Sequence, residues 1–254
     1  KDKISVEALI KNNVYGAIKL LNLCADSPPK YFFSVSTDKA ANPVNIMGAS
    51  KSLMEKLILS KKKNFRVSTA RFANVAFSNG SLLDGFIYRL QKQQPLSCPS
   101  DIKRFFVTPE QSGQICLLAT FLGETGNIFF PKLDFHKDQI FFKDIALDFL
   151  KENGFEAALV QSEQEAKEFN FDNNPNMYPV YFFKTDTSGE KMYEEFYTEE
   201  EDYDLNTFNS LGFINTSDVE VSFEKVEKDF DTVFESPDSD KSDIVNIINE
   251  YVPD

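Results

Sequence analysis

The sequence predicts an α/β protein built on a parallel sheet. Helical and strand patterns alternate over the first 72 residues, the order that parallel sheets with right-handed crossovers require. Polar side chains follow directly on the first predicted strand, and ligands of open α/β sheets bind outside the carboxyl ends of the strands. Hydrophobic residues make up 42% of 254 residues, which is enough to form a core.

The first elements are two helices and two strands. Apolar residues recur at three and four positions from Ile4 to Cys24, which predicts a helix that Pro28-Pro29 ends. The run Tyr31–Val35 predicts a buried strand, and Asn42-Pro43 marks the turn that follows it. In chain order, the predicted ranges are 4–26, 31–36, 48–62 and 65–72.

Beyond residue 80 the predicted elements are shorter and more mixed. Residues 186–240 are acidic with aromatic residues at intervals, and they predict a loosely organised appendage. Helices are predicted at 80–92, 108–122, 141–153 and 243–251, and short strands at 127–130, 157–160 and 181–183.

The chain opens on a helix, and none of its ten glycines forms the Gly-x-Gly-x-x-Gly turn of a Rossmann domain. We therefore expect the C-terminal portion of a Rossmann-like parallel-sheet domain, from a longer protein whose cofactor-binding first half lies elsewhere. A complete small α/β protein would lack the first strands of the sheet. The expected domains are the second half of the cofactor-binding domain (1–78), a smaller mixed α/β substrate-binding region whose strands can return to the main sheet (79–200), and an acidic appendage (201–254).

Composition narrows the class of protein. No run of 18 apolar residues exists, and no signal peptide pattern is visible at the start. The three cysteines are scattered without metal-ligand spacing, so we expect no metal site and a reducing, cytoplasmic location.

The net charge of −13 is unevenly distributed. Residues 1–100 carry 15 lysines and arginines against 6 acidic residues, whereas the remainder carries 12 against 34. The basic part suits an anionic ligand such as a phosphate-bearing molecule. The acidic part is a poor surface for nucleic acid, and we expect no nucleic-acid partner.

The richest chemistry lies at the end of the first strand. Ser36-Thr37-Asp38-Lys39 places hydroxyls, a carboxylate and an amine in succession, and Met47-Gly48-Ala49-Ser50-Lys51 follows on the next helix. Lys51 stands four residues after Met47, on the same helix face. Such a set exceeds what a structural loop needs, although Asp38 could also cap the following segment through local hydrogen bonds.

The segment 36–51 closely resembles the nucleotide-sugar 4,6-dehydratases of bacterial polysaccharide biosynthesis, which are extended short-chain dehydrogenase/reductases. The resemblance runs from residue 12 to about residue 196, in the order that the family's motifs follow. The further matching segments are Asn12–Gly16, Ala70–Val75, Arg104–Glu110, Phe130–Lys132 and Ser188–Glu195.

This resemblance implies an NAD- or NADP-dependent lyase whose tightly bound cofactor is recycled within each turnover. Its substrate would be a nucleotide-activated N-acetylhexosamine, UDP-GlcNAc before GDP-GlcNAc, and its product a 4-keto-6-deoxy sugar nucleotide. Two alternatives stay open. A nucleotide-sugar epimerase would return hydride to C4, and a catalytically silent sugar-nucleotide-binding protein would only sense the ligand.

The resemblance also implies a role for each motif residue. Thr37 would support the C4 oxygen, Asp38 would protonate the departing 6-hydroxyl, and Lys39 would take the C5 proton. Ser36, Met47 and Lys51 are the expected cofactor contacts, with Lys51 on the nicotinamide ribose. The expected substrate contacts are Asn74, Arg104, Lys132 and Glu190.

Met47 departs from the superfamily pattern, which usually has a tyrosine at this position as the base for the C4 hydroxyl. A thioether is a poor proton acceptor. Some dehydratase branches also carry methionine here, so the departure does not exclude activity. We hypothesise that Asp38 acts twice, first as base at O4 and then as acid at O6.

The helices predicted at 4–26 and 48–62 are apolar on more than one face. One face must cover the sheet. We expect the other to pair with the same helices of a second subunit in a two-fold homo-oligomer, as the superfamily commonly does.

Overall fold

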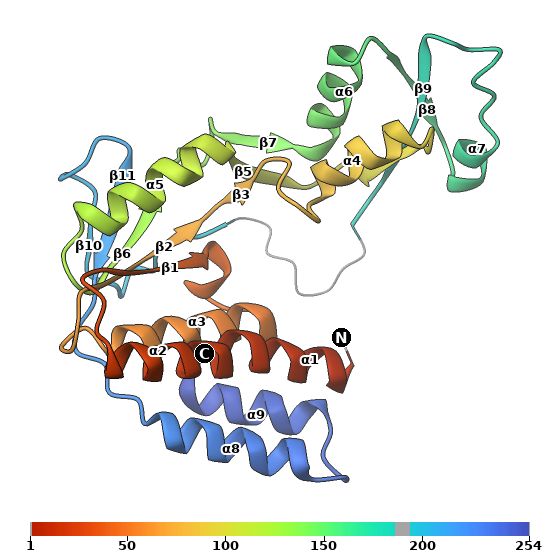
Figure 1. Ribbon diagram of the computed structural model, residues 1–254. Helices are drawn as coiled ribbons and strands as arrows, with labels where there is room; N and C mark the ends of the chain where they lie inside the picture. Colours follow the sequence, from red (N-terminus) through yellow and green to blue (C-terminus); the bar gives the residue numbers. More distant parts are fainter. Residues whose placement is uncertain (1, 186–193, 254) are drawn as a thin grey trace. The chain divides into compact units, whose positions relative to one another are not determined.

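The computed structural model describes residues 2–185 and 194–253, which fold as two compact units (Figure 1). Unit 1 consists of Lys1–Phe72, Ser112–Lys132 and Glu194–Asp254. Unit 2 consists of Ala73–Gln111 and Leu133–Tyr193. The units interleave along the chain, so this division differs from the sequence-based boundaries at residues 78 and 200.

Unit 1 is built on a five-stranded sheet of order β1-β2-β6-β11-β10. The strands β1, β2 and β6 are parallel, and β11 and β10 extend the sheet in antiparallel fashion. The register pairs Thr37 with Phe72 and Ser36 with Arg71. The strand bounds are Phe32–Thr37 (β1), Val67–Phe72 (β2), Asn127–Pro131 (β6), Tyr203–Asp204 (β10) and Leu211–Asn215 (β11).

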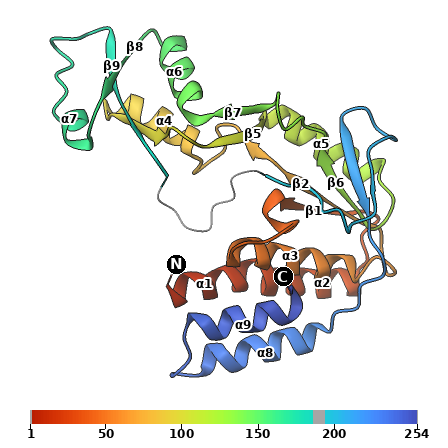
Figure 2. The same ribbon diagram turned by 180° about the vertical axis from the view of Figure 1, so that it is seen from behind.

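Helices cover both faces of this sheet, as both views show (Figures 1 and 2). One face carries α1, a π-helical turn at Lys11–Tyr15, α2 and α3, and the other carries α5. Two further helices, α8 and α9, lie outside α1 and α3 (Figure 2). The helix bounds are Lys3–Ile10 (α1), Gly16–Asp26 (α2), Ile46–Leu59 (α3), Pro109–Phe121 (α5), Phe223–Glu235 (α8) and Lys241–Tyr251 (α9).

The apolar pattern explains how these helices pack. Val6, Ile10, Val14, Ile18 and Leu21 recur at helical spacing and are all fully buried. The helix α3 is buried on nearly all sides, because it lies between the sheet and α9. Its buried residues include the polar Ser50, Ser52 and Glu55 as well as apolar side chains.

Unit 2 has two small sheets of order β3-β5-β7 and β4-β9-β8. Its core lies where α4 and α6 pack on β4 and β9, around Phe86, Cys98, Leu150 and Tyr178. The strands are Asn74–Val75 (β3), Leu96–Pro99 (β4), Lys103–Val107 (β5), Gln139–Phe141 (β7), Glu156–Val160 (β8) and Met177–Phe183 (β9). The helices are Leu82–Gln91 (α4), Phe142–Glu152 (α6) and Glu163–Lys167 (α7).

The structure confirms the predicted α/β class and the predicted helices and strands up to residue 72, with bounds shifted by a few residues. The strand predicted as buried, β1, is instead an edge strand whose residues are mostly half-buried and whose Val35 is 53% exposed. The structure also corrects the prediction for the C-terminal region. Phe223–Glu235, expected to be loosely organised, forms a regular helix, and β11 adds a strand to the main sheet, whereas the helix predicted at 243–251 is confirmed as α9. Within residues 2–185 and 194–253, no helix has the length and apolar character needed to cross a membrane.

Candidate functional site

The Thr37-Asp38-Lys39 cluster lies at the carboxyl end of β1, where a short 3₁₀ turn (Asp38–Ala40) follows the strand. The Thr37 hydroxyl donates to Asp38 Oδ1 at 2.6 Å. Lys39 Nζ lies 3.2 Å from Oδ1 and 3.4 Å from Oδ2 of the same carboxylate. Asp38 is 4% exposed, whereas the Lys39 side chain is 36% exposed. The cluster therefore joins a buried carboxylate to an amine that solvent or a ligand can reach.

The start of α3 lies directly against this cluster. Asn45 caps the helix by accepting a hydrogen bond from the Gly48 amide at 3.0 Å. A Cβ on Gly48 would lie 2.4 Å from the backbone oxygen of Lys39, so only glycine allows this approach. Met47 and Lys51 lie one turn apart on the same face of α3, and both are partly buried. Burial lowers the pKa of Lys51.

Two further polar groups belong to this region, Ser36, which is a predicted cofactor contact, and Asn13, which the sequence did not single out. The hydroxyl of Ser36 is buried and has no hydrogen-bond partner among the described residues. Asn13 donates to Ser50 Oγ at 2.9 Å from the π-helical turn, whereas Asn12 is exposed. Single π-helical turns are frequent at functional sites. Of the segment Asn12–Gly16, which resembles a family motif, it is thus Asn13 and not Asn12 that contacts α3.

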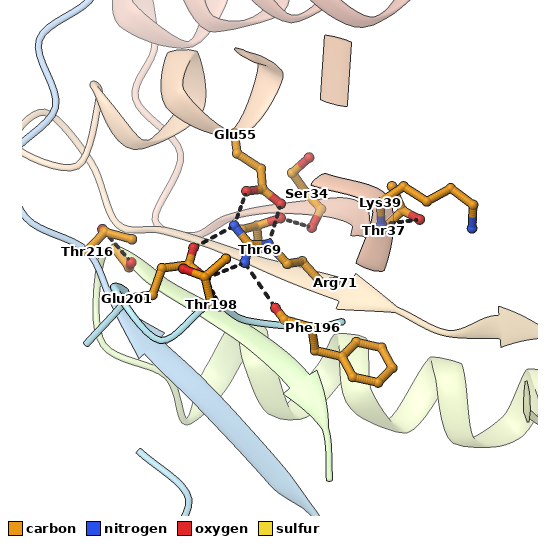
Figure 3. Close-up of polar contacts among 11 residues, drawn as sticks. Ser34, Thr37, Lys39, Glu55, Thr69, Arg71, Phe196, Thr198, Glu201 and Thr216 are labelled. Atoms are coloured by element: carbon orange, nitrogen blue, oxygen red, sulfur yellow. Dashed lines mark hydrogen bonds and ion pairs between the residues drawn. The ribbon is translucent and has the colours of Figure 1, made fainter. Parts of the chain in front are cut away.

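Arg71 organises the polar core behind the cluster (Figure 3). Its guanidinium contacts both carboxylate oxygens of Glu55 at 3.1 and 2.9 Å, and it donates to the backbone oxygen of Phe196 at 3.0 Å. Glu201 adds a second carboxylate, 2.9 Å from Nη2. Burial alone would lower the pKa of Arg71, but the two carboxylates outweigh it and raise the pKa. This network ties β2, α3 and residues 196–201 together.

The predicted substrate contacts fall in different parts of the structure. Asn74 and Arg104 belong to unit 2, where Asn74 donates to the backbone oxygen of Phe105 at 3.1 Å and Arg104 is 5% exposed. Lys132 belongs to unit 1 and donates to the backbone oxygens of Leu205 and Phe208, both at 2.5 Å. Glu190 lies outside the described residues.

No cluster of metal-ligating side chains exists within the described ranges 2–185 and 194–253. The one histidine, His136, is exposed. The titratable groups in contact at the end of β1 are a carboxylate, Asp38, and an amine, Lys39, a pair suited to moving protons.

Comparison with known proteins identifies a family. The model of a family described as "Polysaccharide biosynthesis protein" matches residues 3–215. A protein of Methanocaldococcus jannaschii, named an uncharacterized membrane protein, is 28% identical over 80% of this chain and 57% of its own length. A UDP-N-acetylglucosamine 4,6-dehydratase (inverting) of Campylobacter jejuni is 33% identical over 49% of this chain and 39% of its own length. A UDP-glucose 4-epimerase of Rickettsia bellii is 34% identical over 48% and 38%.

Solved structures show the same fold. Pen from Bacillus thuringiensis matches with a TM-score of 0.62 at 20% identity, over 85% of this chain and 66% of that chain. DesIV, a dTDP-glucose 4,6-dehydratase from Streptomyces venezuelae with NAD and TYD bound, matches with a TM-score of 0.53 at 16% identity, over 73% and 57%. The fold is thus Rossmann-like, and the chain spans only part of the relatives that it matches.

Proposed function

This chain belongs to the polysaccharide biosynthesis protein family, and from that premise we propose that the whole protein modifies a nucleotide sugar. The specific reaction that we propose is the NAD(P)-dependent 4,6-dehydration of a nucleotide-activated N-acetylhexosamine, UDP-GlcNAc first. The observation that carries this proposal is the contact of the buried Asp38 carboxylate with the Lys39 amine and the Thr37 hydroxyl.

Dehydration needs an acid and a base on neighbouring substrate atoms, because the proton leaves C5 while the hydroxyl leaves C6. Asp38 and Lys39 meet this need, since their functional atoms lie 3.2 Å apart at one strand end. Lys39 takes the C5 proton and Asp38 protonates the departing oxygen. In the proposed reaction the Thr37 hydroxyl hydrogen-bonds the C4 oxygen.

Every proton that the reaction moves has a donor and an acceptor if Asp38 acts twice. Asp38 first takes the proton of the C4 hydroxyl, a role that the Met47 thioether cannot fill. It then passes this proton to the departing 6-hydroxyl, which leaves as water. Lys39, whose amine is partly exposed and exchanges its protons with solvent, gives a proton back to C5 when hydride returns to C6. Both side chains end in the protonation states in which they began.

The residues beside the cluster suit a nicotinamide cofactor. The buried Ser36 hydroxyl, which has no partner among the described residues, offers a hydrogen bond to a bound group. Lys51 is partly buried on the α3 face that also carries Met47, where its amine can bind ribose hydroxyls. When bound, the nicotinamide supplies the hydride acceptor and donor. Asn74, Arg104, Lys132 and Glu190 stay predicted substrate contacts.

A second candidate function is epimerisation, which the relative named UDP-glucose 4-epimerase favours. An epimerase needs no acid at O6 and no base at C5. The buried Asp38 beside Lys39 is the feature that favours dehydration over it.

The test is incubation of the protein with NAD⁺ or NADP⁺ and UDP-GlcNAc in heavy water, with GDP-GlcNAc in parallel. Dehydration gives a product that has lost one water and carries solvent deuterium at C5. Epimerisation gives a product of unchanged mass and different retention, without solvent deuterium. An unchanged sugar with either nucleotide and either cofactor would contradict both proposals. Asp26→Asn, at an exposed position, is the matched control for Asp38→Asn.

A further inference from the structure

The C-terminal helices α8 and α9 pack on the outer side of α1 and α3 (Figures 1 and 2). Their buried residues are Phe223, Val226 and Phe230 on α8, and Ile244 and Ile248 on α9, all at helical spacing. Other residues of the two helices, such as Lys228 and Glu250, are exposed. Both helices are therefore amphipathic, with one apolar stripe directed into unit 1.

Polar contacts fix these helices at several separate points. The Tyr15 hydroxyl donates to Asp231 Oδ1 at 2.7 Å and lies 3.1 Å from the backbone oxygen of Glu227. Burial raises the pKa of Tyr15, so the phenol keeps its donor proton. Lys3 Nζ donates to the backbone oxygen of Ser239 at 2.8 Å.

Two further hydrogen bonds involve the C-terminal residue of α9, Tyr251, and one of them comes from α3. Lys56 Nζ donates to the backbone oxygen of Tyr251 at 2.6 Å, and the Tyr251 hydroxyl donates to Asp229 at 2.6 Å. Desolvation lowers the pKa of Lys56, which is consistent with a contact that excludes water. The contacts thus connect α3 to α9, and α9 to α8.

The covered surface is the outer face of the helices for which the sequence predicts a subunit contact, namely 4–26 and 48–62. The family match ends at residue 215, so α8 and α9 lie beyond it. We propose that the α8–α9 hairpin (residues 223–251) is a built-in cap, which closes the outer face of α1 and α3 against a second copy of this chain.

Without the cap, this face would bind a second copy of the chain. Two neighbouring helices with apolar outer faces can pack on their own two-fold copy, since the same patch then serves on both sides. The hairpin packs two adjacent helices of the same chain on this face, as a second copy would pack two helices of its own. Releasing it should therefore turn the face into a self-association surface.

The experiment compares the wild type with two substitutions that each place an aspartate on α8. Val226→Asp puts a carboxylate into the buried stripe, whereas Lys228→Asp puts it on the exposed side. Light scattering after size exclusion should show about twice the wild-type molar mass for Val226→Asp and no change for Lys228→Asp. A wild-type mass for a folded Val226→Asp protein whose α8 amides exchange freely would overturn the proposal.

A second measurement covers the case in which Val226→Asp does not fold. Hydrogen exchange of the wild type should show equal protection of α8 and α9 at low and high protein concentration, because the cap comes from the same chain. Tyr15→Phe removes only the phenolic hydrogen bonds and should speed exchange in α8 but not in α5. Protection that rises with concentration, or a Tyr15→Phe variant without faster α8 exchange, would refute a cap within one chain.

Discussion

Asp38 is the residue on which the proposed chemistry depends most. Its carboxylate is buried between a hydroxyl and an amine, so a substitution there changes charge without opening the surface. Asparagine has nearly the same shape but cannot carry a proton between O4 and O6.

We predict that Asp38→Asn lowers the dehydration rate by at least about a hundredfold, which is the smaller end of what a general acid–base group contributes. In a single-turnover absorbance trace, hydride transfer to the nicotinamide should also be lost, because the O4 base is missing. Normal hydride transfer with blocked water loss would limit Asp38 to its role at O6. Asp26→Asn should leave both steps unchanged.

At the scale of elements, the approach of α3 to the turn after β1 depends on Gly48. Its missing side chain lets the helix pass the backbone of Lys39, and Pro43 closes the space from another side. Such a contact links the position of a proposed base to the packing of an entire helix.

We predict that Gly48→Ala destabilises the protein by about 1 to 3 kcal/mol, the usual cost of overpacking, and lowers turnover by displacing Lys39. Gly85→Ala on α4 is the matched control, because a Cβ there has nothing within 4 Å. That change should stabilise by about 0.5 to 1 kcal/mol, since alanine favours helices over glycine. Urea unfolding and turnover of both variants test this, and equal effects would contradict it.

The Arg71 network joins β2, α3 and residues 196–201 of the same unit, and two of its three charges are almost fully buried. Arg71 and Glu55 have side chains only 4% and 3% exposed. Removing one member leaves the other charge buried without compensation, which costs far more than the pair contributes.

Arg71→Met should lower the free energy of unfolding by about 3 to 5 kcal/mol and speed amide exchange in residues 196–201. Adding Glu55→Leu should recover much of this loss, because the fully buried carboxylate is then gone and the remaining one, Glu201, is partly exposed and still accepts from the Thr198 amide. Lys167→Met, in an exposed pair with Glu163, should cost about 0 to 1 kcal/mol. A double variant less stable than Arg71→Met would contradict this explanation.

At the scale of the whole molecule, the sequence predicted best the helices and strands that depend on the local spacing of apolar residues. The helix from Ile4 and the strand before Thr37 follow from apolar spacing, and the cluster at the strand end follows from chain order. The partner of Arg71 could not be predicted, because its contact with Glu55 depends on how α3 packs on β2. The spacing of Phe223, Val226 and Phe230 indicates a helix, but strongly acidic surroundings hid that signal.

The two units have separate cores, which makes their stabilities separable. In unit 2, Leu150 and Cys98 belong to one buried cluster, and burial raises the pKa of Cys98 to about 12. A thiol in this state reacts only when its surroundings open. In unit 1, Leu57 is fully buried in α3.

We predict that Leu150→Ala, which should cost about 3 to 5 kcal/mol as a cavity in the core, speeds alkylation of Cys98 and leaves amide exchange in α3 unchanged. Leu57→Ala should do the reverse, with faster exchange in α3 and unchanged labelling of Cys98. Thiol labelling and hydrogen exchange on both variants measure the two responses. If each substitution accelerated both probes equally, the two cores would unfold as one cooperative unit, and the cluster at the end of β1 would share the stability of unit 2.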